Sequence, residues 1–85
     1  MNWRIERSAR QSFIVFTLSG RMDAEHVGEL KDLFDPDYRN TILDLRDLRL
    51  ADRDVVRFLR SCEARGMKLE NCPSYVREWM DREKD

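Results

Sequence analysis

The stretch FIVFTL at residues 13–18 is a nearly unbroken apolar run, rich in β-branched and aromatic side chains, around which the rest of the sequence can be arranged. It predicts a central strand with large apolar groups on both faces. TILDL at residues 41–45 is a second, shorter run of the same kind. Apolar residues between the runs recur at helical spacing, so these segments predict parallel strands joined by a crossover helix, right-handed by default.

The crossover helix has a recognisable start and end. Residues 19–22 break the strand pattern, and Asp23 follows as the expected N-cap, because its carboxylate can accept hydrogen bonds from N–H groups of the next turn. We expect the helix to begin near Ala24 and to stop at Asp35-Pro36-Asp37. Its apolar stripe, predicted to pack on the sheet, comprises Val27, Leu30, Leu33 and Phe34.

One further strand is predicted before the central one. Residues 3–6 alternate between apolar and charged side chains, which is the period of a half-buried strand. The polar stretch at residues 8–12 separates them from residues 13–18, so the two strands pair most simply as a hairpin. The first strand is then short and lies at an edge of the sheet.

Two helices and one short strand are predicted after residue 45. A turn through residues 46–54 leads to a helix that ends at Arg65-Gly66, with glycine in the C′ position. Residues 67–69 form the last strand. A third helix starts at Asn71-Cys72-Pro73, since proline is favoured at the first helical position, and the charged residues 81–85 are expected to fray. The apolar stripes are Val55, Val56, Phe58, Leu59 and Cys62 in the second helix, and Tyr75, Val76, Trp79 and Met80 in the third.

This order of elements predicts the α/β fold class, as one domain spanning residues 1–85 with a mixed, mostly parallel four-stranded sheet. Charged residues make up 39% of the chain, yet the formal net charge is -1, so no overall field favours nucleic acid or an anionic membrane. No apolar run approaches the roughly 20 residues of a membrane span. We therefore expect no nucleic-acid partner and no direct membrane insertion.

The cysteines and the start of the chain favour a cytoplasmic protein. MNWR at residues 1–4 leads straight into the first alternating segment without the features of a signal peptide. Cys62 and Cys72 are then expected to be reduced thiols. Cys62 falls on an apolar stripe, whereas Cys72 precedes a helix, where a thiolate is favoured, so a reactive thiol remains an alternative to a packing or capping role.

The residue types that support catalysis are sparse. His26 is the only histidine, and no nucleophile or carboxylate partner is specified beside it by spacing, so it is interpreted as an ordinary helix-surface residue. No CxxC pair, His/Cys cluster or glycine-rich phosphate loop is present. These observations indicate a protein that is not an enzyme and that holds no metal and no cofactor.

The second predicted helix begins with a charged turn. Asp52 and Asp54 precede or open the helix, where one can cap it and the other can interact with its dipole, each for about 0.3 to 1 kcal/mol. Basic and acidic residues interleave around this turn, which is typical of a solvated face of ion pairs. They are Arg46, Arg49, Arg53, Arg57 and Arg60, together with Asp44, Asp47, Asp52 and Asp54.

Three segments resemble a known family in their order and spacing. They are LSGRMDAE at residues 18–25, TILDL followed by LRLAD at residues 41–52, and GMKLENCP at residues 66–73. These resemble the STAS domain, the family of anti-sigma factor antagonists and of the cytoplasmic domains of sulphate transporters. The resemblance covers about residues 13 to 80. It implies a βα superhelix with the crossover helices mainly on one face of the sheet.

The resemblance fails at the site where partner-switching members are phosphorylated. Those members carry Asp-Ser-Ser-Gly at the start of the second helix, where this chain has Asp52, Arg53, Asp54 and Val55. Asp54 stands in place of the acceptor hydroxyl and carries about one negative charge, whereas phosphoserine carries about -1.5 to -2. Either Asp54 mimics the phosphorylated state, or the switch has been lost and the turn is a fixed docking surface. We favour the second, because Arg53 and Val55 also replace small residues.

A second departure concerns exposed apolar surface. Many members continue with another strand and helix, while this sequence stops at residue 85, and residues 13–18 place large side chains on a face that crossover helices would not cover. A homodimer would hide such a surface.

The resemblance implies a non-catalytic protein-interaction module in bacterial signalling and transcription regulation. The expected partner is a regulatory protein such as an anti-sigma factor, or a transporter subunit. Two alternatives remain, an accessory subunit of a transport system and a module that senses a small ligand or nucleotide. The predicted partner-binding residues are Asp23, Asp52, Arg53, Asp54, Arg57 and Arg60, with Asp54 as a degenerate phosphorylation site.

Overall fold

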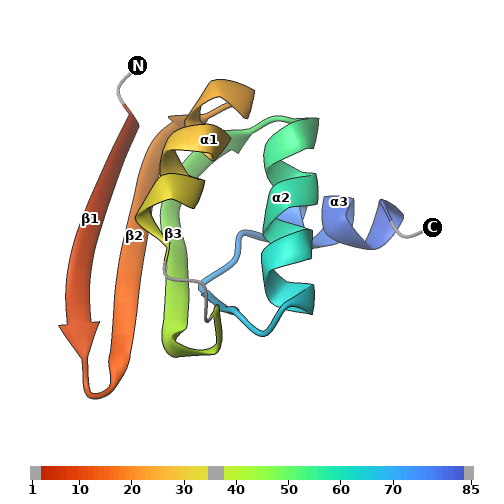
Figure 1. Cartoon of the computed structure of the whole chain (residues 1–85). Helices are drawn as coiled ribbons and strands as arrows, with labels where there is room; N and C mark the ends of the chain where they lie inside the picture. Colours follow the sequence, from red (N-terminus) through yellow and green to blue (C-terminus); the bar gives the residue numbers. More distant parts are fainter. Residues whose placement is uncertain (1–2, 35–37, 84–85) are drawn as a thin grey trace.

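A computed structural model describes residues 3–34 and 38–83, which form a curved sheet with helices on one side (Figure 1). Met1-Asn2, the expected helix stop at Asp35-Pro36-Asp37, and residues 84–85 of the expected frayed end lie outside the described residues. The elements in chain order are β1 (Trp3–Arg10), β2 (Phe13–Met22), α1 (Ala24–Leu33), a short 3-10 helix (Tyr38–Asn40), β3 (Thr41–Ala51), α2 (Arg53–Ala64), β4 (Lys68–Glu70) and α3 (Ser74–Arg82).

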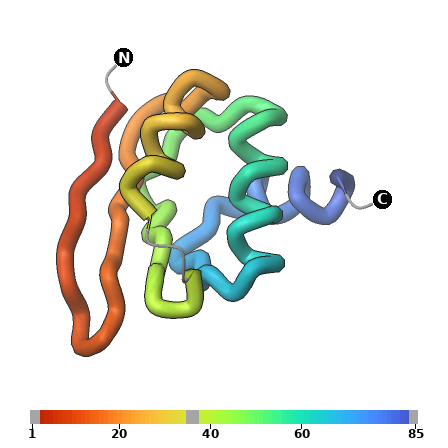
Figure 2. The backbone as a smooth tube through the Cα atoms, viewed as in Figure 1, coloured from red at the N-terminus to blue at the C-terminus, as the bar shows by residue number. Residues whose placement is uncertain are grey.

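The sheet has the strand order β1-β2-β3-β4. β1 pairs antiparallel with β2, while β2, β3 and β4 are mutually parallel, so the predicted mixed, mostly parallel sheet is confirmed. Figure 2 shows α1 and α2 as neighbours on the same side of the sheet, with α3 beyond α2. The expected placement of the crossover helices mainly on one face is also confirmed.

The core lies between the sheet and the helices. All five residues of the predicted α2 stripe are buried, from Val55 to Cys62, against Leu43 and Leu45 of β3 and Leu18 of β2. The α1 stripe was predicted less accurately, because Leu33 is 50% exposed. Phe34 instead turns inward after the last helical residue, with its ring 5.4 Å from Phe16 and 6.0 Å from Phe58, centroid to centroid. Leu33 is the last residue of α1 and points away from the core, and Phe34 takes the inward position after it.

The two central strands are longer than predicted. Residues 19–22 continue β2, and residues 46–51, expected in a turn, continue β3 as its partner. Gly20 has a φ of 86° beside a register shift, so this glycine allows an irregularity in the ladder without ending the strand. In β3, the carboxylate of Asp44 accepts a hydrogen bond from the backbone N–H of Arg46 at 3.0 Å, at a second register shift.

β1 also extends beyond its predicted end, through residue 10. The polar stretch that was interpreted as a connection belongs mostly to the strand, and the hairpin turns at Gln11, which has a φ of 55°, and Ser12. An edge strand that faces solvent tolerates polar residues, and these residues obscure the alternating pattern by which a strand is recognised in the sequence. The hairpin and the edge position were predicted correctly.

The face of the sheet without helices is covered by its own side chains. Val15 and Ile42 are register partners outside the main core cluster, yet they are only 6% and 1% exposed. Arg10 of β1 reaches Glu70 of β4 at 2.7 Å, so the two side chains extend over central strands that separate them by about 14 Å. Less apolar surface remains here than residues 13–18 suggested, and the homodimer stays a prediction.

α3 differs from its prediction at both ends. Pro73 was predicted at the first helical position but is the N-cap, so the helix begins one residue later, at Ser74. The helix then continues through Arg82. Val76 and Met80 are buried, whereas Tyr75 is 40% exposed. The described part of the expected frayed end is held in place, because Glu83 contacts α2. None of the described helices is long and apolar enough to cross a bilayer.

Candidate functional site

The parallel pairing of β2 and β3 brings two helix starts together. Met22 and Ala51 are the last register partners, so the next residues, Asp23 and Asp52, begin α1 and α2 at the same edge of the sheet. Asp52 is the N-cap of α2, where its Oδ1 accepts from the N–H of Val55 at 3.0 Å. Its Oδ2 accepts from the N–H of Ala24 at 3.2 Å, at the start of α1. One carboxylate thus accepts a backbone N–H from the first turn of each of two helices.

Asp23 caps α1 as predicted, but with an unexpected contribution from His26. The carboxylate of Asp23 accepts from the N–H of Glu25 at 3.1 Å, and the N–H of Asp23 donates to Nδ1 of His26 at 3.2 Å. Nδ1 of His26 also lies 3.3 Å from Oδ1 of Asp23. The His26 ring also stacks on Trp3 at 4.2 Å. His26 is therefore half-buried and structural, and its interpretation as an ordinary surface residue was wrong.

Asp54 lies in the exposed first turn of α2. There it favours the positive end of the helix, which is the second of the two roles predicted for the acidic pair. Together with Arg57 and Phe58 it lines an open groove of about 290 Å³ that continues to Val27 and Lys31 of α1. The carboxylate of Asp54 is thus accessible from solvent at this groove.

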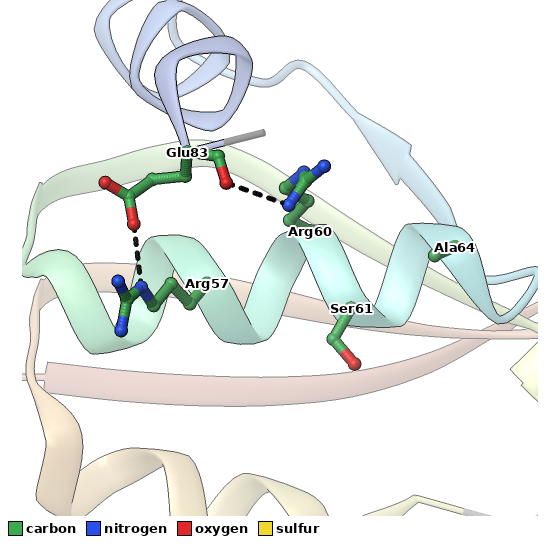
Figure 3. A pocket seen from close by; sticks show the side chains of 5 residues that line it. All are labelled: Arg57, Arg60, Ser61, Ala64 and Glu83. Atoms are coloured by element: carbon green, nitrogen blue, oxygen red, sulfur yellow. Dashed lines mark hydrogen bonds and ion pairs between the residues drawn. The ribbon is translucent and has the colours of Figure 1, made fainter. Parts of the chain in front are cut away.

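The three predicted arginines of α2 converge on Glu83, a residue that the sequence did not suggest, and Figure 3 shows two of them, Arg57 and Arg60. Nε of Arg57 lies 2.7 Å from Oε1 of Glu83, and Nε of Arg53 lies 3.5 Å from the same oxygen. Nη1 of Arg60 donates to the backbone carbonyl of Glu83 at 3.0 Å. The interleaved ion pairs expected along the chain are represented by Arg46 and Asp44, at 3.6 Å. The arginines of α2 turn to the end of α3.

Charge pairing across α2 and α3 changes the acidity of two glutamates. The pKa of Glu83 is lowered, mainly by its hydrogen bond with Arg57. A second link joins Glu63 of α2 to Arg77 of α3 by two hydrogen bonds of 2.8 and 3.0 Å, and this bidentate contact lowers the pKa of Glu63. Both carboxylates are therefore ionised at neutral pH and connect the two helices.

Two open grooves flank Glu83. One, of about 400 Å³, is lined by Arg57, Arg60, Ser61 and Ala64. The other, of about 420 Å³, is lined by Tyr75, Trp79 and Arg82. The sequence prediction missed Glu83 as well as both aromatic residues as surface features. The helical stripe pointed to Tyr75 and Trp79 as core, and no spacing rule relates Glu83 to residues of α2.

The cysteines do not provide a reactive group at this surface. Burial raises the pKa of Cys62 to about 12, and burial also raises the pKa of Cys72. Desolvation at Cys72 outweighs the nearby charge of Arg77, which disfavours the thiolate that a helix start would favour. Among the residues that the structure describes, no three His, Cys, Asp or Glu side chains gather to hold a metal ion.

Comparisons with known proteins support the fold. Searches of protein-family models and of curated proteins found no match. A solved structure, the STAS domain of an antisigma-factor antagonist from Rhodobacter sphaeroides, is similar with a TM-score of 0.63 and 11% sequence identity, over 81% of this chain and 86% of that chain. The chain therefore has a STAS-like fold, as the resemblance of its segments predicted.

Proposed function

We propose that this protein is a non-catalytic regulatory module that binds another protein through the start and the exposed face of α2. The observation that carries the proposal is the contrast between two neighbouring acids. Asp52 is engaged by backbone groups of both helices, whereas Asp54, two residues on, is exposed beside Arg57 at the mouth of a groove. The first acid maintains the turn, and the second is available to a partner.

A fixed docking surface agrees with the chemistry of this turn better than a phosphorylation switch. Ser and Thr are absent from residues 51–57, so a kinase finds no hydroxyl on this turn. The carboxylate of Asp54 keeps its charge without modification. We propose that the module is constitutively competent to bind, in the cytoplasm, and that its partner is a regulatory protein such as an anti-sigma factor. The STAS-like fold of an antisigma-factor antagonist supports this class of partner.

The proposal is tested by charge reversal at the proposed surface. Wild type, Asp54→Lys and Arg57→Glu are each expressed with an affinity tag in the source organism, and the recovered proteins are quantified. A partner recovered with wild type is then purified and its Kd is measured directly for each variant. We expect at least tenfold weaker binding for both reversals, because a like charge placed opposite a complementary surface is repelled.

Arg4→Glu is the matched control. Arg4 is 70% exposed on β1, away from α2, and its reversal changes the net charge as Arg57→Glu does. Circular dichroism establishes that each variant is folded. If the partner binds Asp54→Lys and Arg57→Glu as tightly as it binds Arg4→Glu, this surface is not the docking site. Sedimentation of the wild type at tens of micromolar separately tests the homodimer, which a monomer would exclude.

A further inference from the structure

Glu83 lies between two grooves of different chemistry. The groove on one side is basic, with Arg57 and Arg60 on its wall, and the groove on the other side is aromatic, with Tyr75 and Trp79. Both grooves include Glu83 itself. Tryptophan, tyrosine and arginine are the residues that most often dominate the energetics of protein interfaces. This part of the surface therefore combines them around one acidic side chain of the protein's own.

We infer that this surface binds an acidic segment of a protein partner, which displaces Glu83. A carboxylate of the segment contacts Arg57 and Arg60, while a neighbouring apolar side chain enters the groove at Tyr75 and Trp79. The inference rests on the proposed function, since it names the chemistry of the partner at the exposed face of α2. Glu83 then acts as an intramolecular competitor for the docking surface.

The contacts of Glu83 identify a peptide, and not a simple anion, as the ligand. Arg57 binds its side-chain carboxylate at 2.7 Å, and Arg60 binds its backbone carbonyl at 3.0 Å (Figure 3). The arginines thus accommodate both the side-chain carboxylate and the backbone carbonyl of one acidic residue. A free phosphate could satisfy the guanidinium groups, but it carries no side chain for the aromatic groove. An acidic residue followed by an apolar one matches both grooves.

Exchange is physically reasonable because the arginines remain accessible. The side chains of Arg53 and Arg57 are 63% and 56% exposed, whereas that of Glu83 is 14% exposed. Because both guanidinium groups face solvent even while they are paired, a partner carboxylate can approach them and displace Glu83. Glu83 also follows the last turn of α3 as its C-cap residue, and helix ends open more readily than helix centres.

The test measures the binding of fluorescein-labelled peptides to the whole chain by anisotropy. The probes are repeats of Glu-Glu-Leu-Leu, Glu-Glu-Ser-Ser and Lys-Lys-Leu-Leu. We expect the first to bind most tightly, the second more weakly and the third least. Glu83→Gln should bind the first peptide about two- to fivefold tighter, because the competing carboxylate is removed. Glu78→Gln, an exposed acid on the same helix, is the matched control and should leave binding unchanged.

Two further variants examine the two grooves separately. Arg57→Gln combined with Arg60→Gln should weaken Glu-Glu-Leu-Leu binding at least tenfold. Tyr75→Ala should weaken Glu-Glu-Leu-Leu binding but not Glu-Glu-Ser-Ser binding. Circular dichroism confirms folding in every case. This pattern supports displacement of Glu83 by an acidic and apolar segment.

Several results would overturn the inference. One is that the Lys-Lys-Leu-Leu peptide binds as tightly as the Glu-Glu-Leu-Leu peptide. A second is that inorganic phosphate at an equal concentration displaces the acidic peptide. A third is that the Glu83→Gln variant binds the acidic peptide no more tightly than the Glu78→Gln variant does. Occupation of the surface by a second copy of this chain, seen by sedimentation, would also overturn it. If the peptides fail while the native partner still depends on Asp54, only this inference fails. If the partner ignores both Asp54 and Arg57, the proposed docking site fails as well.

Discussion

The start of α2 and its exposed face both concentrate charge, but they satisfy it in different ways. At the start, Asp52 accepts hydrogen bonds from backbone N–H groups of the two adjoining helix starts. On the exposed face, Arg57 and Arg60 depend on Glu83, which lies 26 and 23 residues away in sequence. Backbone donors cannot leave without unfolding a helix, whereas a side chain on another helix can be exchanged. The start of α2 therefore has a structural role, whereas the side-chain contacts on its exposed face can be exchanged.

Replacing the cap should produce the largest effect on stability. Asp52→Ala removes acceptors from the first turns of both α1 and α2, and we expect a loss of about 2 kcal/mol in the free energy of unfolding, measured by urea denaturation. Asp54→Ala is the control within the same turn and should cost only a few tenths of a kcal/mol, through the helix dipole. Equal effects of the two substitutions would contradict the division of roles.

The start of α1 should respond to the same chemistry on a smaller scale. Asp23→Ala removes one cap bond, so we expect a loss of about 1 kcal/mol, again from urea denaturation. Glu25→Gln changes an exposed acid in the same turn but keeps the backbone N–H that donates to Asp23, and should have a much smaller effect. A loss for Asp23→Ala no larger than that for Glu25→Gln would show that this cap is unimportant.

Acid should weaken the ion pairs that join α2 to α3 and Glu83. The pKa values of Glu63 and Glu83 are lowered in the folded protein by Arg77 and Arg57 respectively. A lowered folded pKa contributes stability above the unfolded value, and this contribution is lost as pH falls through the folded pKa. We expect the thermal midpoint of the wild type to decrease as the pH is lowered below about 4.5. The decrease should be less steep in the double variant Glu63→Gln, Glu83→Gln. An identical pH profile in both proteins would contradict the pairing.

The smallest expected effect is the change that salt makes to the thermal midpoint of the Glu83→Gln variant relative to wild type. The effect of Glu83→Gln on the thermal midpoint is expected to be slight at low ionic strength and to vanish near 1 M NaCl, because exposed ion pairs are screened. The effect of Asp52→Ala should persist at both salt concentrations, because it depends on short hydrogen bonds to helix ends. Calorimetry of the two variants at both salt concentrations measures this contrast. If the effect of Glu83→Gln did not depend on salt, the two variants would not differ as expected.

Residues whose partners are near in sequence were predictable. The cap at Asp23, and a cap of α2 by one of the two acids at residues 52 and 54, follow from their position before a helical pattern; the structure shows Asp23 and Asp52 in these roles. The buried stripe of α2 followed from its periodicity, and the end of that helix at Gly66, with a φ of 102°, followed from glycine at C′. Each of these depends on a few consecutive residues, which is the range over which sequence patterns carry information.

Residues whose partners are distant were not predictable. Strand pairing extended β2 and β3 together past Gly20 and Arg46, because a ladder of backbone hydrogen bonds outweighs weak local strand propensity. The ring of His26 stacks on Trp3, which is 23 residues away in sequence. Residues 81–83 were interpreted as part of a frayed end, but Glu83 contacts α2. A charged residue with no periodic pattern contains no local signal of the helix against which it will lie.

Local patterns in the sequence predicted the order of the elements, the mixed parallel sheet, the cap at Asp23 and a cap of α2 by one of the acids at residues 52 and 54. These depend on hydrophobic period, capping chemistry and residue identity, all of which are local. The tertiary structure alone decided that Asp52 joins two helix starts and that Glu83 holds Arg57 and Arg60 between two grooves. Such contacts arise only when packing of the apolar stripes brings distant helices within hydrogen-bonding distance.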